Sequence, residues 1–227
     1  MTDPSPNLAT RLLDRVAALA EDEERVLLGI TGAPAAGKST LAEWLVRELP
    51  GVGLPAAWVP MDGFHLADAA LDRLGRRDRK GALDTFDGHG YLALLRRLRL
   101  ETDNTVYAPA FERDLEQPIA GSIAVPAGTR VVVTEGNYLL VGAHPWPFVR
   151  SELSEVWFSE VEPIQRRERL VARHIRFGKA PDAAAAWAES VDEPNARLIA
   201  ATRERADLVI DFDALGIEPE RPGQPPL

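Results

Sequence analysis

The sequence predicts an α/β protein built on a five-stranded parallel sheet, and three observations support this. Short, continuously apolar runs recur along the chain, as expected of strands that are buried on both faces. Helical patterns lie between these runs, and strands that alternate with helices form parallel sheets. Hydrophobic residues make up 45% and charged residues 27% of the 227 positions, which is typical of a chain that buries a core. We therefore expect one domain over residues 1–216, followed by a disordered, proline-rich tail at 217–227.

The elements are expected in a regular order. An amphipathic helix begins at Leu8 and is followed by the first buried strand. The five strands are expected at 26–31, 57–61, 130–134, 156–159 and 207–211, with helices at 41–49 and 91–100. Two β-rich segments, 105–108 and 119–125, predict a hairpin attached to the sheet. Pro163 and Gly178 then frame a helix at its start and end, and residues 181–190 predict a second helix after it.

The charge balance limits the partners of the chain. Its 26 basic and 35 acidic residues give a net charge of −9, which repels nucleic-acid phosphates and anionic membrane surfaces. No stretch approaches the roughly 20 apolar residues of a membrane span, and residues 1–7 lack the pattern of a signal peptide. The chain has no cysteine, which excludes disulfides and thiolate nucleophiles. We expect a cytoplasmic protein that binds neither nucleic acid nor membranes, with a homodimer as one alternative for its oligomeric state.

One motif specifies a ligand. The run Gly32-Ala33-Pro34-Ala35-Ala36-Gly37-Lys38-Ser39 matches G-x-x-x-x-G-K-[ST], the Walker A phosphate loop, and lies between the first strand and a helix. Backbone N–H groups and the helix N-terminus then converge on one anion site. Lys38 would neutralise the β- and γ-phosphates, and the Ser39 hydroxyl would bind Mg²⁺. The predicted cofactors are therefore ATP and Mg²⁺, and Thr40 completes the predicted nucleotide-binding segment.

Two carboxylates follow predicted strands. Asp62, in Met61-Asp62-Gly63-Phe64-His65, comes after the second strand, and the carboxyl ends of neighbouring parallel strands face one crevice. Asp62 could accept the proton of a substrate hydroxyl, or it could close an Asp-Gly turn. Glu135 ends the third strand and could hold Mg²⁺ directly or through water, or it could be a turn carboxylate. His65 could hydrogen-bond an acceptor or pack inside the protein.

These blocks together resemble a known family. In order, they are G-A-P-A-A-G-K-S-T, M-D-G-F-H, K-G-A-L-D-T-F-D, Y-A-P-A-F-E-R, T-E-G-N-Y-L-L and R-L-V-A-R-H-I-R-F-G-K. The chain resembles the P-loop kinases that include pantothenate kinase, uridine kinase and phosphoribulokinase, and it is most similar to their fructose-transport-associated, nucleoside/nucleotide kinase-like branch. The resemblance implies a P-loop NTPase fold with strand order 2-3-1-4-5, and phosphorylation of a hydroxyl on a small metabolite. It also implies Asp62 as the base and Glu135 near the metal and the acceptor.

The resemblance implies further substrate contacts. Phe86 or Asp84 would line the acceptor pocket, while Asp87 is well placed as a helix N-cap. Arg113, in the hairpin segment, would contact the substrate or be solvated. The segments that read the acceptor differ from those of the pantothenate, uridine and ribulose-phosphate enzymes, so the identity of the acceptor does not transfer.

Four arginines share one face of the helix that Pro163 begins. They are Arg166, Arg169, Arg173 and Arg176, spaced three, four and three residues apart, with only Glu168 nearby in sequence to pair with them. By resemblance this helix is the first part of a lid that covers about residues 163–195. Arg173 and Arg176 would close over ATP and stabilise charge on the transferred phosphoryl group. Asn195 would belong to the site or cap a helix.

Two functions follow from these residues. The first is an ATP-dependent kinase that phosphorylates a sugar, nucleoside or pantothenate-like alcohol, with Asp62, Lys38 and Arg173 as catalytic residues. The second is a regulatory ATPase that hydrolyses the nucleotide without a small acceptor. The three lysines, Lys38, Lys80 and Lys179, are not preceded by Asn, so the guanine-reading N-K-x-D motif of switch GTPases does not occur.

Overall fold

Five parallel strands form the central sheet of the computed structural model, which describes residues 7–217. They are β1 (Val26–Thr31), β2 (Ala56–Trp58), β5 (Val131–Glu135), β6 (Glu155–Glu160) and β7 (Leu208–Asp211). Their spatial order is β2-β5-β1-β6-β7, which is the predicted order 2-3-1-4-5 when only these five strands are numbered. The second strand is shorter than predicted because residues Met61–Phe64 turn into a 3₁₀ helix, η2. The predicted α/β fold class is confirmed.

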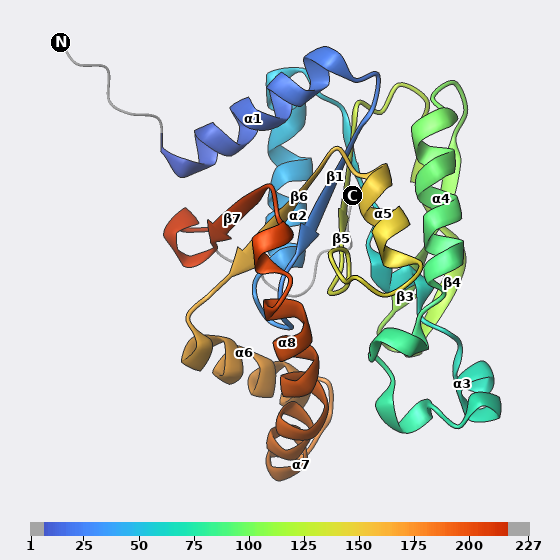
Figure 1. Cartoon of the computed structure of the whole chain (residues 1–227), viewed down its shortest axis with the longest axis vertical. Helices are drawn as coiled ribbons and strands as arrows, with labels where there is room; N and C mark the ends of the chain where they lie inside the picture. The colour runs from blue at the N-terminus through green and yellow to red at the C-terminus, as the bar shows by residue number, and fades with distance from the viewer. Residues whose placement is uncertain (1–6, 218–227) are drawn as a thin grey trace.

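Helices cover both faces of the sheet, with α1 and α2 on one face and α4 and α5 on the other (Figure 1). The helices are α1 (Leu8–Asp22), α2 (Lys38–Glu48), α3 (Asp68–Leu74), α4 (Gly88–Leu100), α5 (Trp146–Glu152), α6 (Pro163–Arg176), α7 (Pro181–Trp187) and α8 (Glu193–Ala200). As predicted, Asp87 caps α4, since its side chain accepts a hydrogen bond from the Gly90 N–H at 2.8 Å. No helix within residues 7–217 is long and apolar enough to cross a membrane.

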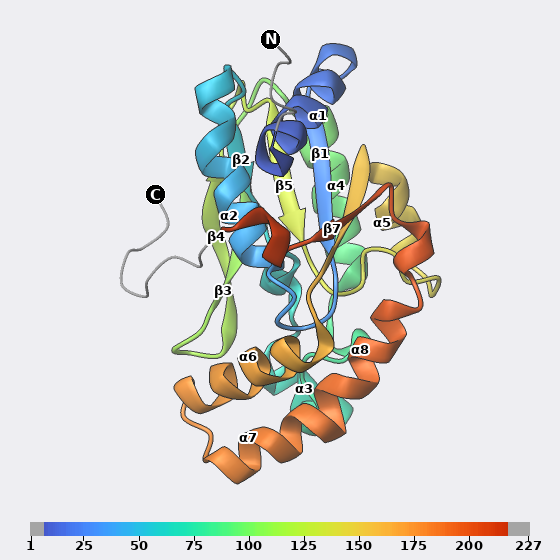
Figure 2. The same ribbon diagram turned by 90° about the vertical axis from the view of Figure 1, so that its left-hand side faces the viewer.

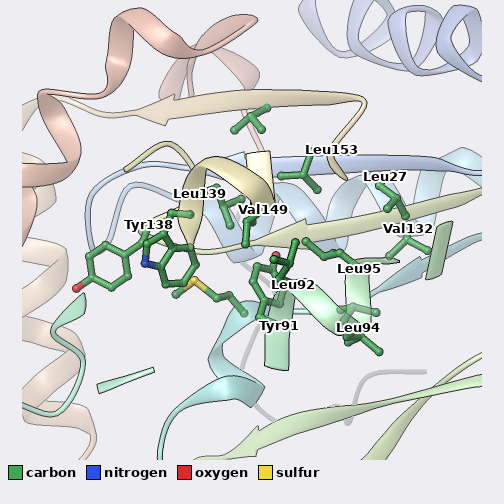
Figure 3. Packing of buried hydrophobic residues seen from close by; sticks show 14 of the residues in the cluster. Leu27, Tyr91, Leu92, Leu94, Leu95, Val132, Tyr138, Leu139, Val149 and Leu153 are labelled. Carbon is green, nitrogen blue, oxygen red and sulfur yellow. The ribbon is translucent and has the colours of Figure 1, made fainter. Parts of the chain in front are cut away.

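The two covered faces explain the continuous apolar runs of the strands. Successive strand side chains point to opposite faces, so Leu27 packs under α4 and α5 while its neighbours Val26 and Leu28 pack under α1 and α2. Val132 in β5 shares the face of Leu27. Figure 3 shows Leu27 and Val132 in one buried cluster with residues of α4, among them Tyr91, whose ring is fully buried.

The hairpin consists of β3 (Val106–Glu112) and β4 (Gln117–Val125), and it differs from the prediction. It forms a separate two-stranded sheet and does not add to the main sheet. Its backbone groups pair with each other, and buried Val106, Ala108 and Val125 anchor it to the core on the α4 side. The register shifts between Ala108 and Ala110, which leaves Pro109 in an irregular position where a proline is tolerated.

Helices α6, α7 and α8 form an extended unit that we call the helical arm (residues 163–200), in which a π-helical segment at Ala188–Asp192 joins α7 to α8. The arm lies beyond the carboxyl ends of β1 and β5 (Figure 2). Ile217, at the start of the predicted tail, packs against the core cluster of α1 and α2. The rest of the predicted disordered tail, 218–227, lies outside the described residues.

A close backbone contact connects η2 to the hairpin and supplies a test of this arrangement. A Cβ atom on Gly63 would lie 2.2 Å from the carbonyl oxygen of Pro109. We expect Gly63→Ala to lower the free energy of unfolding by about 2 kcal/mol, as overpacked sites do, and the melting temperature by about 4–8 °C. Gly51→Ala is the matched control, because a Cβ there meets no atom within 4 Å. Equal melting temperatures for the two variants would contradict the contact.

Candidate active site

The phosphate loop connects β1 to α2 and has the conformation that an anion site requires. Helix α2 begins at Lys38, so the N–H groups of its first turn lack partners within the helix. Gly37 has φ 82°, and a Cβ there would lie 2.5 Å from the ring of Phe212, so only glycine fits. Ala35 has φ 65°, a conformation that is uncommon without glycine and that clusters at functional sites.

Lys38 is nearly buried at the base of this loop, with 8% of its surface exposed. Its Nζ donates a hydrogen bond to the carbonyl oxygen of Ala33 at 3.0 Å. Desolvation lowers the pKa of Lys38 to about 8, although the negative charges of Glu135 and Asp62 oppose this shift. A bound phosphate would supply the negative charge that this ammonium group lacks.

Ser39 and Glu135 present oxygen atoms next to Lys38. The Ser39 hydroxyl donates to Oε1 of Glu135 at 3.2 Å, and Glu135 is only 5% exposed. Burial, reinforced by the charge of Asp62, raises the pKa of Glu135, and Lys38 acts in the opposite direction. Hydroxyl and carboxylate oxygens suit Mg²⁺, which takes one or two protein ligands together with substrate phosphates. This pair therefore fits the predicted magnesium ion.

Asp62 and His65 extend from η2 toward the hairpin. Arg113 of the hairpin lies near Asp62, with its Nη2 atom 3.8 Å from Oδ2 of Asp62. Both side chains are partly exposed. His65 Nδ1 lies 2.8 Å from the Asp62 carbonyl oxygen, so Nδ1 carries the proton. Burial lowers the pKa of His65, and its ring contacts Phe86 and Phe111 at centroid distances of 4.0 and 4.7 Å. His65 is thus a packed residue that also lines the site.

The four arginines of α6 lie in different surroundings. Arg166 bonds to Glu193, and Arg169 bonds to Asp213 at 2.7 Å, so the expectation that they lack acidic partners was wrong. Both partners come from distant parts of the sequence. Arg173 has no hydrogen-bonded carboxylate among residues 7–217 and lines the cleft described next. The guanidinium of Arg176 instead lies over the ring of Phe177, 5.7 Å from its centroid.

These groups surround one cleft of about 460 Å³, a typical volume for a small-molecule site. The predicted site residues on its wall are Pro34, Lys38, Ser39, Asp62, His65, Phe86, Arg113, Glu135 and Arg173. The other predicted nucleotide-binding residues, Gly32, Ala33, Ala35, Ala36, Gly37, Thr40 and Arg176, do not line it. Asp84 is also outside it and pairs with Arg79.

Of the two alternatives for Asn195, a site residue or a helix cap, the structure favours the first. It is the third residue of α8 and its Nδ2 donates to the Val191 carbonyl oxygen at 3.0 Å, so it does not cap that helix. It lines the cleft instead.

Sequence reasoning missed several residues of the cleft wall, among them Lys80, Phe111, Lys179 and Trp187. A signal for the lysines was present. The chain has 26 basic residues but only three lysines, and all three line this cleft. The aromatic residues carry no comparable mark in the sequence.

Comparisons with known proteins establish the family. No family model matches the chain. A Schizosaccharomyces pombe protein provisionally named a uridine kinase is 32% identical over 182 residues, which cover 77% of each chain. The chain belongs to the P-loop kinase family. The uncharacterized protein YggC of Escherichia coli K12 is 31% identical over 216 residues, covering 92% of this kinase and 88% of YggC.

Solved structures agree with this assignment. A protein from Silicibacter sp. TM1040, provisionally described as a fructose transport system kinase, is 38% identical with a TM-score of 0.76, covering 86% of this kinase and 98% of that chain. YFH7 of Saccharomyces cerevisiae has the same fold, with a TM-score of 0.73 at 19% identity, covering 89% and 98%. The chain is an ATP-dependent kinase, a phosphotransferase with an alcohol group of a small molecule as acceptor, and this part of the sequence prediction is confirmed.

The lowered pKa of Lys38 gives a pH-dependence test of the phosphate loop. Below a pH of about 8 the free protein already carries the charged lysine, so the affinity for ATP is constant. Above that pH, ATP binding must take up a proton, and the apparent Kd rises by up to about tenfold per pH unit. Calorimetric titration of ATP from pH 7 to 9.5 measures this dependence. Lys38→Arg keeps its charge and should give a flat profile, whereas a flat wild-type profile would contradict the assignment.

Proposed function

We propose that this kinase transfers the γ-phosphoryl group of Mg·ATP to a hydroxyl of a small metabolite of the sugar, nucleoside or pantothenate type. The observation that carries the proposal is that Asp62 shares one cleft with Lys38, Ser39 and Glu135. A candidate proton acceptor therefore lies on the same cleft wall as the groups that would hold the transferred phosphate.

The residues near the phosphate loop would prepare ATP for transfer. The backbone N–H groups of the loop and the Lys38 ammonium would bind the phosphates. Ser39 and Glu135 would hold Mg²⁺, which would neutralise phosphate charge. Arg173 reaches the cleft from the arm, and no carboxylate of residues 7–217 is hydrogen-bonded to it. Its guanidinium would therefore be available to stabilise the charge of the transferred group.

Asp62 would act on the acceptor. Its carboxylate would take the hydroxyl proton while the hydroxyl oxygen bonds to the γ-phosphorus and the bond to the leaving ADP breaks. The wall beyond Asp62, built from His65, Phe86 and Phe111, offers apolar faces against which a carbon skeleton can pack. A nucleotide-hydrolysing regulator would use no such wall, so the wall supports a kinase over that alternative.

The names of the relatives suggest the acceptor classes to test. One relative is provisionally named a uridine kinase and one solved structure is provisionally described as a fructose transport system kinase, so nucleosides and sugars come first. Pantothenate-like alcohols are the third class. The first experiment is to find which of them accelerates ADP release by the wild-type protein.

Asp62→Asn tests the role of the carboxylate once an accelerating acceptor is found. The change preserves size but removes basicity, so we expect phosphoryl transfer to fall by roughly 10²- to 10⁴-fold while ATP affinity stays within several-fold. Asp72→Asn is the control, since Asp72 is an exposed carboxylate on the neighbouring helix α3. Equal transfer rates in Asp62→Asn and wild type would remove Asp62 from the mechanism. Failure of every acceptor to accelerate ADP release would contradict the three proposed acceptor classes.

A further inference from the structure

The cations of the cleft divide into three groups by their partners. Lys38 and Arg173 lie where the phosphates of ATP are proposed to bind. Two others are already ion-paired, because Arg77 bonds to Asp68 at 2.8 Å and to Asp72 at 3.0 Å, and Lys80 bonds to Asp68 at 2.7 Å. The remaining two are Arg113, which the hairpin contributes, and Lys179, which follows the first helix of the arm.

Arg113 lacks a close acidic partner among the described residues. Its nearest carboxylate is Asp62 at 3.8 Å, too far for a hydrogen bond, and that carboxylate is needed for the acceptor hydroxyl. Its guanidinium lies over the ring of Phe177 with its carbon 5.7 Å from the centroid. The aromatic face positions the cation without neutralising it.

Lys179 is held in a similar way. Its Nζ lies 4.6 Å from the centroid of the Trp187 ring, and within residues 7–217 it forms no ion pair or side-chain hydrogen bond. Two cations from two different elements are thus fixed over aromatic rings at the wall of one cleft. Such ammonium and guanidinium groups bind carboxylate or phosphate oxygens by charge-assisted hydrogen bonds.

The charge of Arg113 also acts on the rest of the site. Desolvation is the main cause of the lowered pKa of Arg173, and repulsion from Arg113 is the next. The charges of Asp62, Glu135 and Asp192 oppose this shift, and a bound anion would further relieve the repulsion between Arg113 and Arg173. The phosphates of ATP would neutralise Arg173, and Arg113 and Lys179 would still lack an anion.

We infer that the acceptor carries an anionic group, a carboxylate or a phosphate, in addition to the hydroxyl that is phosphorylated, and that Arg113 and Lys179 bind this group. The inference rests on the proposed function, because it describes the second substrate of the same site. One anion held by both residues connects the hairpin to the arm. Acceptor binding then closes the cleft around the hydroxyl and Asp62.

Matched pairs of acceptors test the inference, each pair differing in the anionic group. The probes are D-glycerate and glycerol, pantothenate and panthenol, D-ribose 5-phosphate and D-ribose, and uridine 5′-monophosphate and uridine. Acceptor-dependent ADP release gives kcat/KM, and calorimetry with saturating Mg·AMP-PNP gives binding without turnover. We expect the charged member of at least one pair to be preferred by tenfold or more. The pairs also distinguish a carboxylate from a phosphate.

Substitutions then assign that preference to the two cations. Arg113→Gln and Lys179→Gln should each raise the KM of the preferred charged acceptor by about 10- to 100-fold and leave the KM of ATP within threefold. The neutral partner should be unaffected, and Arg113→Lys should recover part of the loss. Arg167→Gln is the control, because Arg167 is an exposed, ion-paired arginine of the same arm.

The results separate this inference from the proposed function. The inference is overturned if no charged acceptor binds better than its neutral partner, or if the variants weaken both members of a pair equally. Preferential transfer to a neutral acceptor would overturn the inference and leave the kinase function in place. Preferential binding of a charged compound that is never phosphorylated would contradict the proposed function and leave only the anion binding by Arg113 and Lys179.

Discussion

The burial of opposite charges at the carboxyl edge of the sheet is the constraint on which the rest of the site depends. Lys38 and Glu135 are both almost fully buried. Desolvation lowers the pKa of Lys38 and raises the pKa of Glu135, so it favours the neutral form of each group. Each group therefore lacks part of the charge compensation that water would give. A phosphate beside Lys38 and a divalent cation beside Glu135 would supply it, which makes the site electrostatically suited to a metal–nucleotide complex.

Sheet topology brings these charges together. Strands β1 and β5 are parallel neighbours with Ile30 opposite Glu135, so the phosphate loop that follows β1 passes beside that carboxylate. The strand next to β5 on its other side is β2, and η2 follows it with Asp62. The arm and the hairpin then add cations from outside the sheet. The site thus depends on the neighbouring carboxyl ends of β2, β5 and β1.

The sequence predicted what local pattern and chemistry determine. The apolar runs identified every strand of the main sheet, and the Walker A motif identified Lys38 and Ser39 because their spacing is tied to phosphate binding. The sequence did not predict long-range ion pairs. Arg166 is bonded to Glu193 and Arg169 to Asp213, and no local pattern connects these residues. Lys179 was missed although lysine is rare in this chain, because its place in the site depends on how the arm folds over the cleft.

The central claim, that buried Glu135 is compensated by a cation which arrives with the nucleotide, is tested most directly by measuring ATP affinity with and without Mg²⁺. In the wild type, Mg²⁺ should strengthen ATP binding. Glu135→Gln removes the charge but retains the shape. In this variant the ratio of the ATP affinities with and without Mg²⁺ should be smaller by tenfold or more, while the affinity for metal-free ATP stays equal or improves. An unchanged effect of Mg²⁺ in the variant would contradict the account.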